Sequence, residues 1–120
     1  SFKNNIPKDA PYKVYEYDPG IEGKEGVQTP KDFLICIDVL EHVEPNLIDN
    51  VIKQIADSIK IQGYLTIAMY PAMRILQDGR NAHLIVEDMP WWVNKLSQYL
   101  SILSITKTNQ QLDVIVENKK

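Results

Sequence analysis

The fold of this chain is indicated most clearly by residues 33–42, which read FLICIDVLEH. The first five residues are continuously apolar, as is typical of a strand in a parallel sheet that is covered by helices on both faces. The polar residues Asp38, Glu41 and His42 follow directly. We therefore expect a buried strand that runs into an acidic, histidine-containing turn.

A helix and a second strand are expected after this segment. Apolar residues recur at helical spacing from Leu47 to Ile59, and Asn46 is the expected N-cap. Gly63 is expected to break this pattern, and residues 64–69 resemble a second buried strand. Strand, helix and strand within about 40 residues form a βαβ unit with parallel strands. In such sheets ligands bind at the carboxyl ends of the strands.

Further strands and a second helix are expected on either side of this βαβ unit. Residues 12–17 alternate as a strand and end at the turn Asp18-Pro19-Gly20. The run Met89-Pro90-Trp91-Trp92 opens a second helix, with proline in its first turn. Residues 102–106 and 112–117 predict a hairpin. We expect a mostly parallel sheet with a C-terminal antiparallel hairpin and helices on its faces.

Length and composition predict an ordinary globular domain. The 120 residues are expected to form a single domain, with 44% hydrophobic and 24% charged residues. A net charge of -3 disfavours nucleic-acid binding through a basic surface. The lone Cys36 cannot form an internal disulfide, which fits a reducing compartment. No apolar stretch is long enough to span a bilayer and no signal peptide opens the sequence, so a cytoplasmic location is expected.

The turn after residues 33–37 carries the first group of candidate functional residues. Glu41 and His42 bring a carboxylate and an imidazole that can act as general base, substrate donor or metal ligand. A metal would need further ligands at fixed spacing, and the only other histidine, His83, is distant in sequence. No metal site is therefore expected. Asp18 can accept both hydroxyls of a ribose, or it can cap its own turn.

A later loop concentrates more functional groups than a plain connector needs. It carries a carboxylate, a guanidinium, an amide and an imidazole, on Asp78, Arg80, Asn81 and His83. This loop either lies over the same crevice or is a solvated connector in which Asp78 pairs with Arg80. Trp91 and Trp92 are more typical of helix packing than of a base-stacking surface.

These residues together resemble the class I S-adenosylmethionine-dependent methyltransferases, in particular small members from bacteriophage and bacteria. Residues 15–20 are similar to the family's second strand, whose terminal acid binds the ribose of the cofactor. Residues 32–43 are similar to its fourth strand and the motif that follows. The resemblance implies a Rossmann-like methyltransferase fold, S-adenosyl-L-methionine as cofactor and methyl transfer to an acceptor.

The resemblance also implies roles for single residues. Cofactor contacts are implied for Asp18, Pro19, Asp38, Val39 and Leu40. Handling of the substrate proton is implied for Glu41 or His42. Substrate contacts are implied for Arg80, Asn81, His83 and Trp91.

The chain departs from the family in one respect, because the glycine-rich turn after the family's first strand has no counterpart. None of the five glycines forms a G-x-G pattern before a helix. We therefore expect an incomplete methyltransferase sheet that lacks the first strand and helix. The family's second and fourth strands must then pair directly, or a partner chain or a missing N-terminal segment must cover the exposed edges.

Two further expectations follow from this departure. One is a homo-oligomer, expected to be a dimer. The other is an alternative function, in which the chain is a non-catalytic methyltransferase remnant that acts as an oligomeric or assembly subunit. Another nucleotide-binding α/β domain, such as a dehydrogenase, also needs the glycine turn and lacks support from the Asp38-to-His42 motif. The fold leaves the acceptor open, since many chemistries use it.

Overall fold

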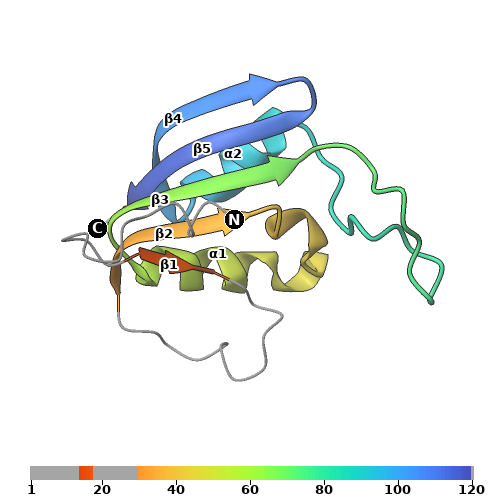
Figure 1. Cartoon of the computed structure of the whole chain (residues 1–120), viewed down its shortest axis with the longest axis horizontal. Coiled ribbons are helices and arrows are strands. Elements are labelled where there is room, and N and C mark those ends of the chain that lie inside the picture. Colours follow the sequence, from red (N-terminus) through yellow and green to blue (C-terminus); the bar gives the residue numbers. More distant parts are fainter. Residues whose placement is uncertain (1–13, 18–29, 120) are drawn as a thin grey trace.

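The structure, a computed structural model, describes residues 14–17 and 30–119 (Figure 1). Its elements in chain order are β1 (Val14–Glu16), β2 (Lys31–Ile37), the 3₁₀ turns η2 (Leu40–His42) and η3 (Pro45–Leu47), α1 (Ile48–Asp57), β3 (Ile59–Ala68), α2 (Met89–Ser97), β4 (Leu100–Thr108) and β5 (Gln111–Asn118). No helix among the described residues is long and apolar enough to cross a membrane.

The five strands form one sheet in the order β1-β2-β3-β5-β4. The pairs β1–β2 and β2–β3 are parallel, and the pairs β3–β5 and β5–β4 are antiparallel. The α/β architecture with a C-terminal hairpin is therefore confirmed. Two of the four pairs of adjacent strands are parallel. The expected direct pairing of residues 15–17 with residues 33–37 is also confirmed, since Glu16 lies opposite Ile35.

Both described α-helices cover the same face of the sheet, as Figure 1 shows for α1 and α2. Asp49 of α1 joins them, because its carboxylate lies 2.8 Å from the Nζ of Lys95 and accepts a hydrogen bond of 3.0 Å from the hydroxyl of Tyr99. Alternate residues of β5 point into this layer and are fully buried, namely Leu112, Val114 and Val116. Ile115, between them, faces the other side and is exposed. The core therefore lies between the helices and one sheet face.

The start of α1 differs from the prediction. The N-cap is Leu47, without a side-chain hydrogen bond, and Asn46 lies one residue earlier inside the 3₁₀ turn η3. The prediction of Asn46 as N-cap was wrong because Pro45 starts a separate turn, so the chain enters α1 from η3 rather than from an extended residue.

The role predicted for Gly63 was also wrong. It lies inside β3, which starts at Ile59, rather than before a strand at residue 64. A Cβ at this position would lie 2.7 Å from Cδ1 of Ile59 and 3.1 Å from Cγ2 of Val116. Glycine fits here because two side chains approach the backbone closely, and a larger residue would require the end of the Ile59 side chain to move.

Candidate functional site

The carboxyl end of β2 is held in a tight turn by β3. Asp38 has a positive φ of 53°, a conformation that aspartate tolerates better than most residues. Its backbone N–H lies 3.1 Å from the carbonyl oxygen of Thr66 and 3.0 Å from the Oγ1 of Thr66. The Thr66 hydroxyl in turn donates to the carboxylate of Asp38 at 2.9 Å. These bonds fix where the following 3₁₀ turn η2 begins.

Glu41, in the middle of η2, is a fully buried acid. Among the described residues, neither of its carboxylate oxygens has a donor that meets the distance and angle of a hydrogen bond, although the backbone N–H groups of Glu41 and Ala68 lie close enough to affect its pKa. The pKa of Glu41 is raised to about 7, mainly by burial and to a lesser extent by the charge of Asp38, while the backbone N–H groups and His83 act in the opposite direction. A buried polar group without a partner is uncommon in native proteins and calls for an explanation.

Two imidazoles lie beside this acid, each bonded to the backbone through the same ring nitrogen. Nδ1 of His42 lies 3.0 Å from the carbonyl oxygen of Ala82, and Nδ1 of His83 bonds to the carbonyl oxygen of Tyr70. Because a carbonyl oxygen only accepts, each Nδ1 carries the proton and donates it. Whenever such a ring is neutral, its Nε2 atom therefore carries the free lone pair.

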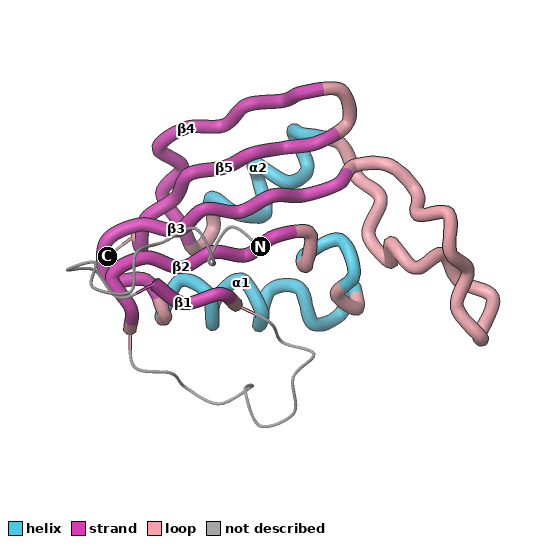
Figure 2. The backbone as a smooth tube through the Cα atoms, viewed as in Figure 1, coloured by secondary structure: helices cyan, strands magenta, loops and turns pink. Residues whose placement is uncertain are grey.

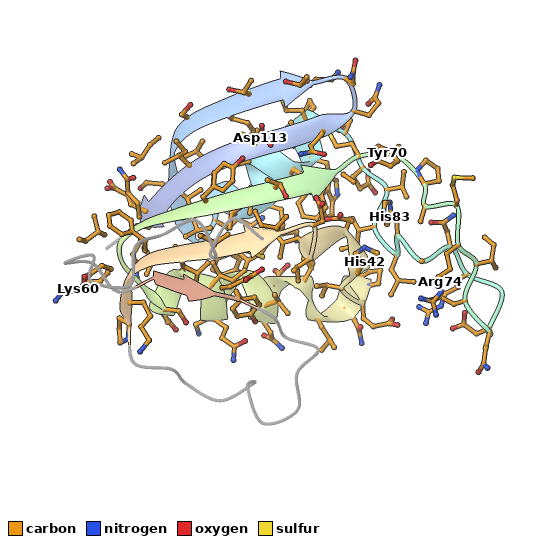
Figure 3. All side chains as sticks on the ribbon, in the orientation of Figure 1. His42, Lys60, Tyr70, Arg74, His83 and Asp113 are labelled. Atoms are coloured by element: carbon orange, nitrogen blue, oxygen red, sulfur yellow. The ribbon has the colours of Figure 1, made fainter. Side chains whose placement is uncertain are left out.

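The two histidine rings are neighbours, with centroids 4.7 Å apart and an edge-to-face angle of 85°. Figure 3 shows them at the carboxyl edge of the sheet. One metal-binding atom from each of Glu41, His42 and His83 lies within 4.8 Å of the others. The structure thus unites two groups of residues that the sequence placed in separate segments, since β2 and β3 run parallel and end at the same edge.

Asn81 shapes the loop that delivers His83. Its Oδ1 accepts from the backbone N–H of Ala72 at 2.8 Å and from that of His83 at 2.9 Å. Its Nδ2 donates to the carbonyl oxygen of Ala72 at 2.9 Å. Figure 2 shows this loop as part of the long segment that projects between β3 and α2. Three bonds from one side chain therefore hold the turn, and the predicted substrate contact of Asn81 stays a prediction.

Arg80 lies on the same loop and forms ion pairs with two exposed acids, Glu44 and Asp78. Its guanidinium makes two hydrogen bonds to the carboxylate of Glu44, at 2.9 and 2.8 Å, and one to Asp78 at 2.8 Å. These bonds lower the pKa values of both acids. Arg80 therefore ties the loop to the segment after η2, and its predicted substrate contact stays a prediction.

The remaining predicted site residues lie in different settings. Leu40 is fully buried in the core, and Val39 packs against that core. Trp91, in the first turn of α2, stacks edge to face on the fully buried Trp92 at 4.9 Å between ring centroids. Its backbone N–H is capped by Asp88 at 3.2 Å. Asp18 and Pro19 lie outside the described residues.

A hollow with a volume of about 380 Å³ opens at the same edge of the sheet. Its lining joins the end of β3 to the hairpin turn and comprises Tyr70, Thr108, Asn109, Gln110, Gln111 and Asp113. Tyr70 connects the hollow to the histidines, since its ring centroid lies 5.6 Å from that of His83. Sequence reasoning missed this hollow, because it needs the end of β3 and the β4–β5 turn to be neighbours.

No family model and no curated protein matches this sequence. Solved structures do match its fold. A protein from Pyrococcus horikoshii is 16% identical with a TM-score of 0.59, over 78% of this chain and 54% of that one. DhpI in complex with SAH is 14% identical with a TM-score of 0.61, over 76% and 48% of the two chains.

A third match is a 1,6-didemethyltoxoflavin N1-methyltransferase from Burkholderia thailandensis with bound 1,6-didemethyltoxoflavin and S-adenosylhomocysteine. It is 12% identical with a TM-score of 0.57, over 78% of this chain and 46% of that one. This chain spans about half the length of these three proteins. At such identities the likeness establishes the fold alone, and this chain shares the Rossmann-like α/β fold of these proteins over about three quarters of its length.

Proposed function

We propose that this chain is a methyltransferase-like domain that takes part in methyl transfer from S-adenosyl-L-methionine to an acceptor. The observation that carries this proposal is the placement of the Asp38-to-His42 motif at the carboxyl end of β2, where sheets of this kind bind ligands. Two proteins that share the fold were solved with S-adenosylhomocysteine (SAH), which supports that choice of cofactor.

The residues of this edge fit one wall of a cofactor site. Thr66 fixes the backbone of Asp38, and the core anchors Leu40, so the turn presents a rigid surface. Asp38, Val39 and Leu40 are proposed to line the cofactor, and Asp18 with Pro19 to meet its ribose. The bound cofactor would supply an electrophilic methyl group, and orientation of the acceptor would provide most of the rate enhancement.

The acceptor is proposed to approach from the hollow beside Tyr70. Glu41 and His42 are the groups proposed to take its proton, since their carboxylate and imidazole lie beside His83, whose ring neighbours that of Tyr70. Arg80, Asn81, His83 and Trp91 are the proposed acceptor contacts. The chemical nature of the acceptor is left open by this proposal.

Calorimetric titration of the 120-residue chain with S-adenosylhomocysteine tests the cofactor proposal. Saturable heat with one site is the expected result. Asp38→Ala should weaken binding, because it removes the carboxylate held by Thr66. Asp57→Ala, on the exposed end of α1, is the matched control and should bind as the parent does. Absence of heat at millimolar ligand contradicts cofactor binding by this chain.

Self-association is a second proposal, favoured by the sheet face that α1 and α2 leave uncovered. Ile115 faces away from the core and is 36% exposed, and Leu103, at the irregularity of the neighbouring strand β4, is 48% exposed. We propose that two copies of the chain pair through it, whether the dimer is catalytic or serves as an assembly subunit. Light scattering should give twice the monomer mass, and Leu103→Asp should return the monomer. A stable monomer at high protein concentration contradicts this proposal.

A further inference from the structure

The buried carboxylate of Glu41 has no well-formed hydrogen bond among the described residues, although the backbone N–H groups of Glu41 and Ala68 lie near it. In the part of the chain that the structure describes, three buried side-chain polar atoms lack a hydrogen bond, and two of them are the oxygens of Glu41. The third is Nε1 of Trp92, in the core. A carboxylate removed from water is stabilised by hydrogen bonds, by a cation or by a metal ion. The atoms that lie next to these oxygens therefore decide which partner fits.

The two histidines beside Glu41 are arranged as metal ligands usually are. A metal-binding histidine commonly donates its second ring N–H to a carbonyl or carboxylate, which fixes the ring and leaves the other nitrogen for the ion. His42 and His83 both do this, through the carbonyls of Ala82 and Tyr70. Asn81 adds a further constraint by accepting from the backbone N–H of His83.

We propose that Glu41, His42 and His83 bind one divalent transition-metal ion, for which Zn²⁺ is the best-suited probe. Two imidazoles and one carboxylate form a donor set that suits Zn²⁺, whereas Mg²⁺ and Ca²⁺ prefer oxygen ligands alone. One ligand atom from each residue lies within 4.8 Å of the others, and Nε2 is the nitrogen that the bonds to the carbonyl oxygens leave available in both rings. Bonds of about 2.0–2.2 Å require ligand atoms about 3.4 Å apart, so the side chains close inward by roughly an ångström on binding.

Three protein ligands leave at least one coordination position open. Sites of this type bind a water or a substrate oxygen there, whereas structural zinc sites use four protein ligands. His42 is exposed, so the site borders solvent, and the hollow lined by Tyr70 lies next to His83. If the proposed methyl transfer holds, an ion bound here would lower the pKa of an acceptor hydroxyl at the open position, and Glu41 and His42 would hold the ion instead of taking the proton themselves. The ion site itself stands independently, because neither its ligands nor its test involve the cofactor.

The test is a Zn²⁺ titration of the metal-free 120-residue chain and of three variants. Glu41→Gln keeps the shape and removes the charge, and His83→Gln removes a ligand on the exposed loop. Glu44→Gln is the matched control, an acid three residues from Glu41 that pairs with Arg80 instead. One saturable site is expected in the parent and in Glu44→Gln, with affinity about 100-fold lower in the two ligand variants.

Two readouts keep the result decisive. Co²⁺ bound in place of Zn²⁺ should give a visible absorption band that His83→Gln abolishes, and circular dichroism confirms that each variant is folded. If Glu41→Gln fails to fold, His83→Gln decides the test. The proposal is overturned if the parent shows no binding below about 1 mM Zn²⁺. It is equally overturned if folded Glu41→Gln binds as the parent does, which would indicate an adventitious histidine pair.

Discussion

Two polar clusters join the segment after β2 to the loop after β3, and they differ in how their charges are satisfied. The paired cluster consists of Glu44, Asp78 and Arg80, and the site cluster of Glu41, His42 and His83. In the paired cluster every charge is exposed and has a partner within 2.9 Å. In the site cluster the carboxylate is buried and has no hydrogen bond from the described residues. The contrast teaches that the paired cluster is complete in itself, and it is the reason for proposing a metal ion at the site cluster.

The largest expected effect is stabilisation of the fold by Zn²⁺ through the site cluster. Binding to the native state alone adds about 2.7 kcal/mol at a free ion concentration about 100 times Kd. The Tm should therefore rise by several degrees and return to its starting value with a chelator. Differential scanning calorimetry on the parent and on Glu41→Gln measures this. An equal rise in both proteins would contradict the assignment of the carboxylate.

The next effect is a gain in stability when the unpartnered carboxylate is removed. Glu41→Met replaces it with an apolar side chain of similar length, and we expect the free energy of unfolding without metal to rise by about 1–2 kcal/mol. Urea unfolding measures the change. Glu44→Met is the matched control and should give no gain, because Glu44 is exposed and paired. A loss of stability in Glu41→Met would show that the carboxylate has partners in the fold.

A smaller effect is expected at Asn81, which links the two clusters along the chain. Asn81→Ala removes three hydrogen bonds that shape the turn before His83. We expect unfolding to become easier by about 1 kcal/mol, since the site is only partly buried. Zn²⁺ affinity should fall by about 10-fold, as for other residues that orient a ligand. Unchanged affinity would indicate that His83 is held by its bond to Tyr70 alone.

The sequence predicted those elements whose cause is local. The apolar run of β2, the hairpin of β4 and β5, and the helix that buries Trp92 all follow from side-chain pattern within a few residues. Asn46 and Gly63 were misread because a neighbouring turn and a close packing contact override local preference.

The same distinction between local and distant causes explains why only part of the site was predicted. Glu41 and His42 lie next to the strand that presents them, so the sequence identified them directly. The position of His83 depends on the path of a loop, which Asn81 fixes by bonds to Ala72. The spacing of apolar residues does not predict the path of a loop. The βαβ topology does indicate that the loop starts near Glu41 and His42, because it brings the ends of β2 and β3 to the same edge of the sheet.

The smallest effect is expected in the paired cluster. Arg80→Ala breaks all its ion pairs, but these groups are exposed, so water and salt already screen them. We expect a drop in Tm that is smaller than for Asn81→Ala and that disappears as salt is raised. Zn²⁺ affinity should stay unchanged, because no atom of Arg80 belongs to the site cluster. A salt-independent loss of Zn²⁺ binding would contradict the separation of the two clusters, since it would mean that the surface ion pairs position the buried ligands.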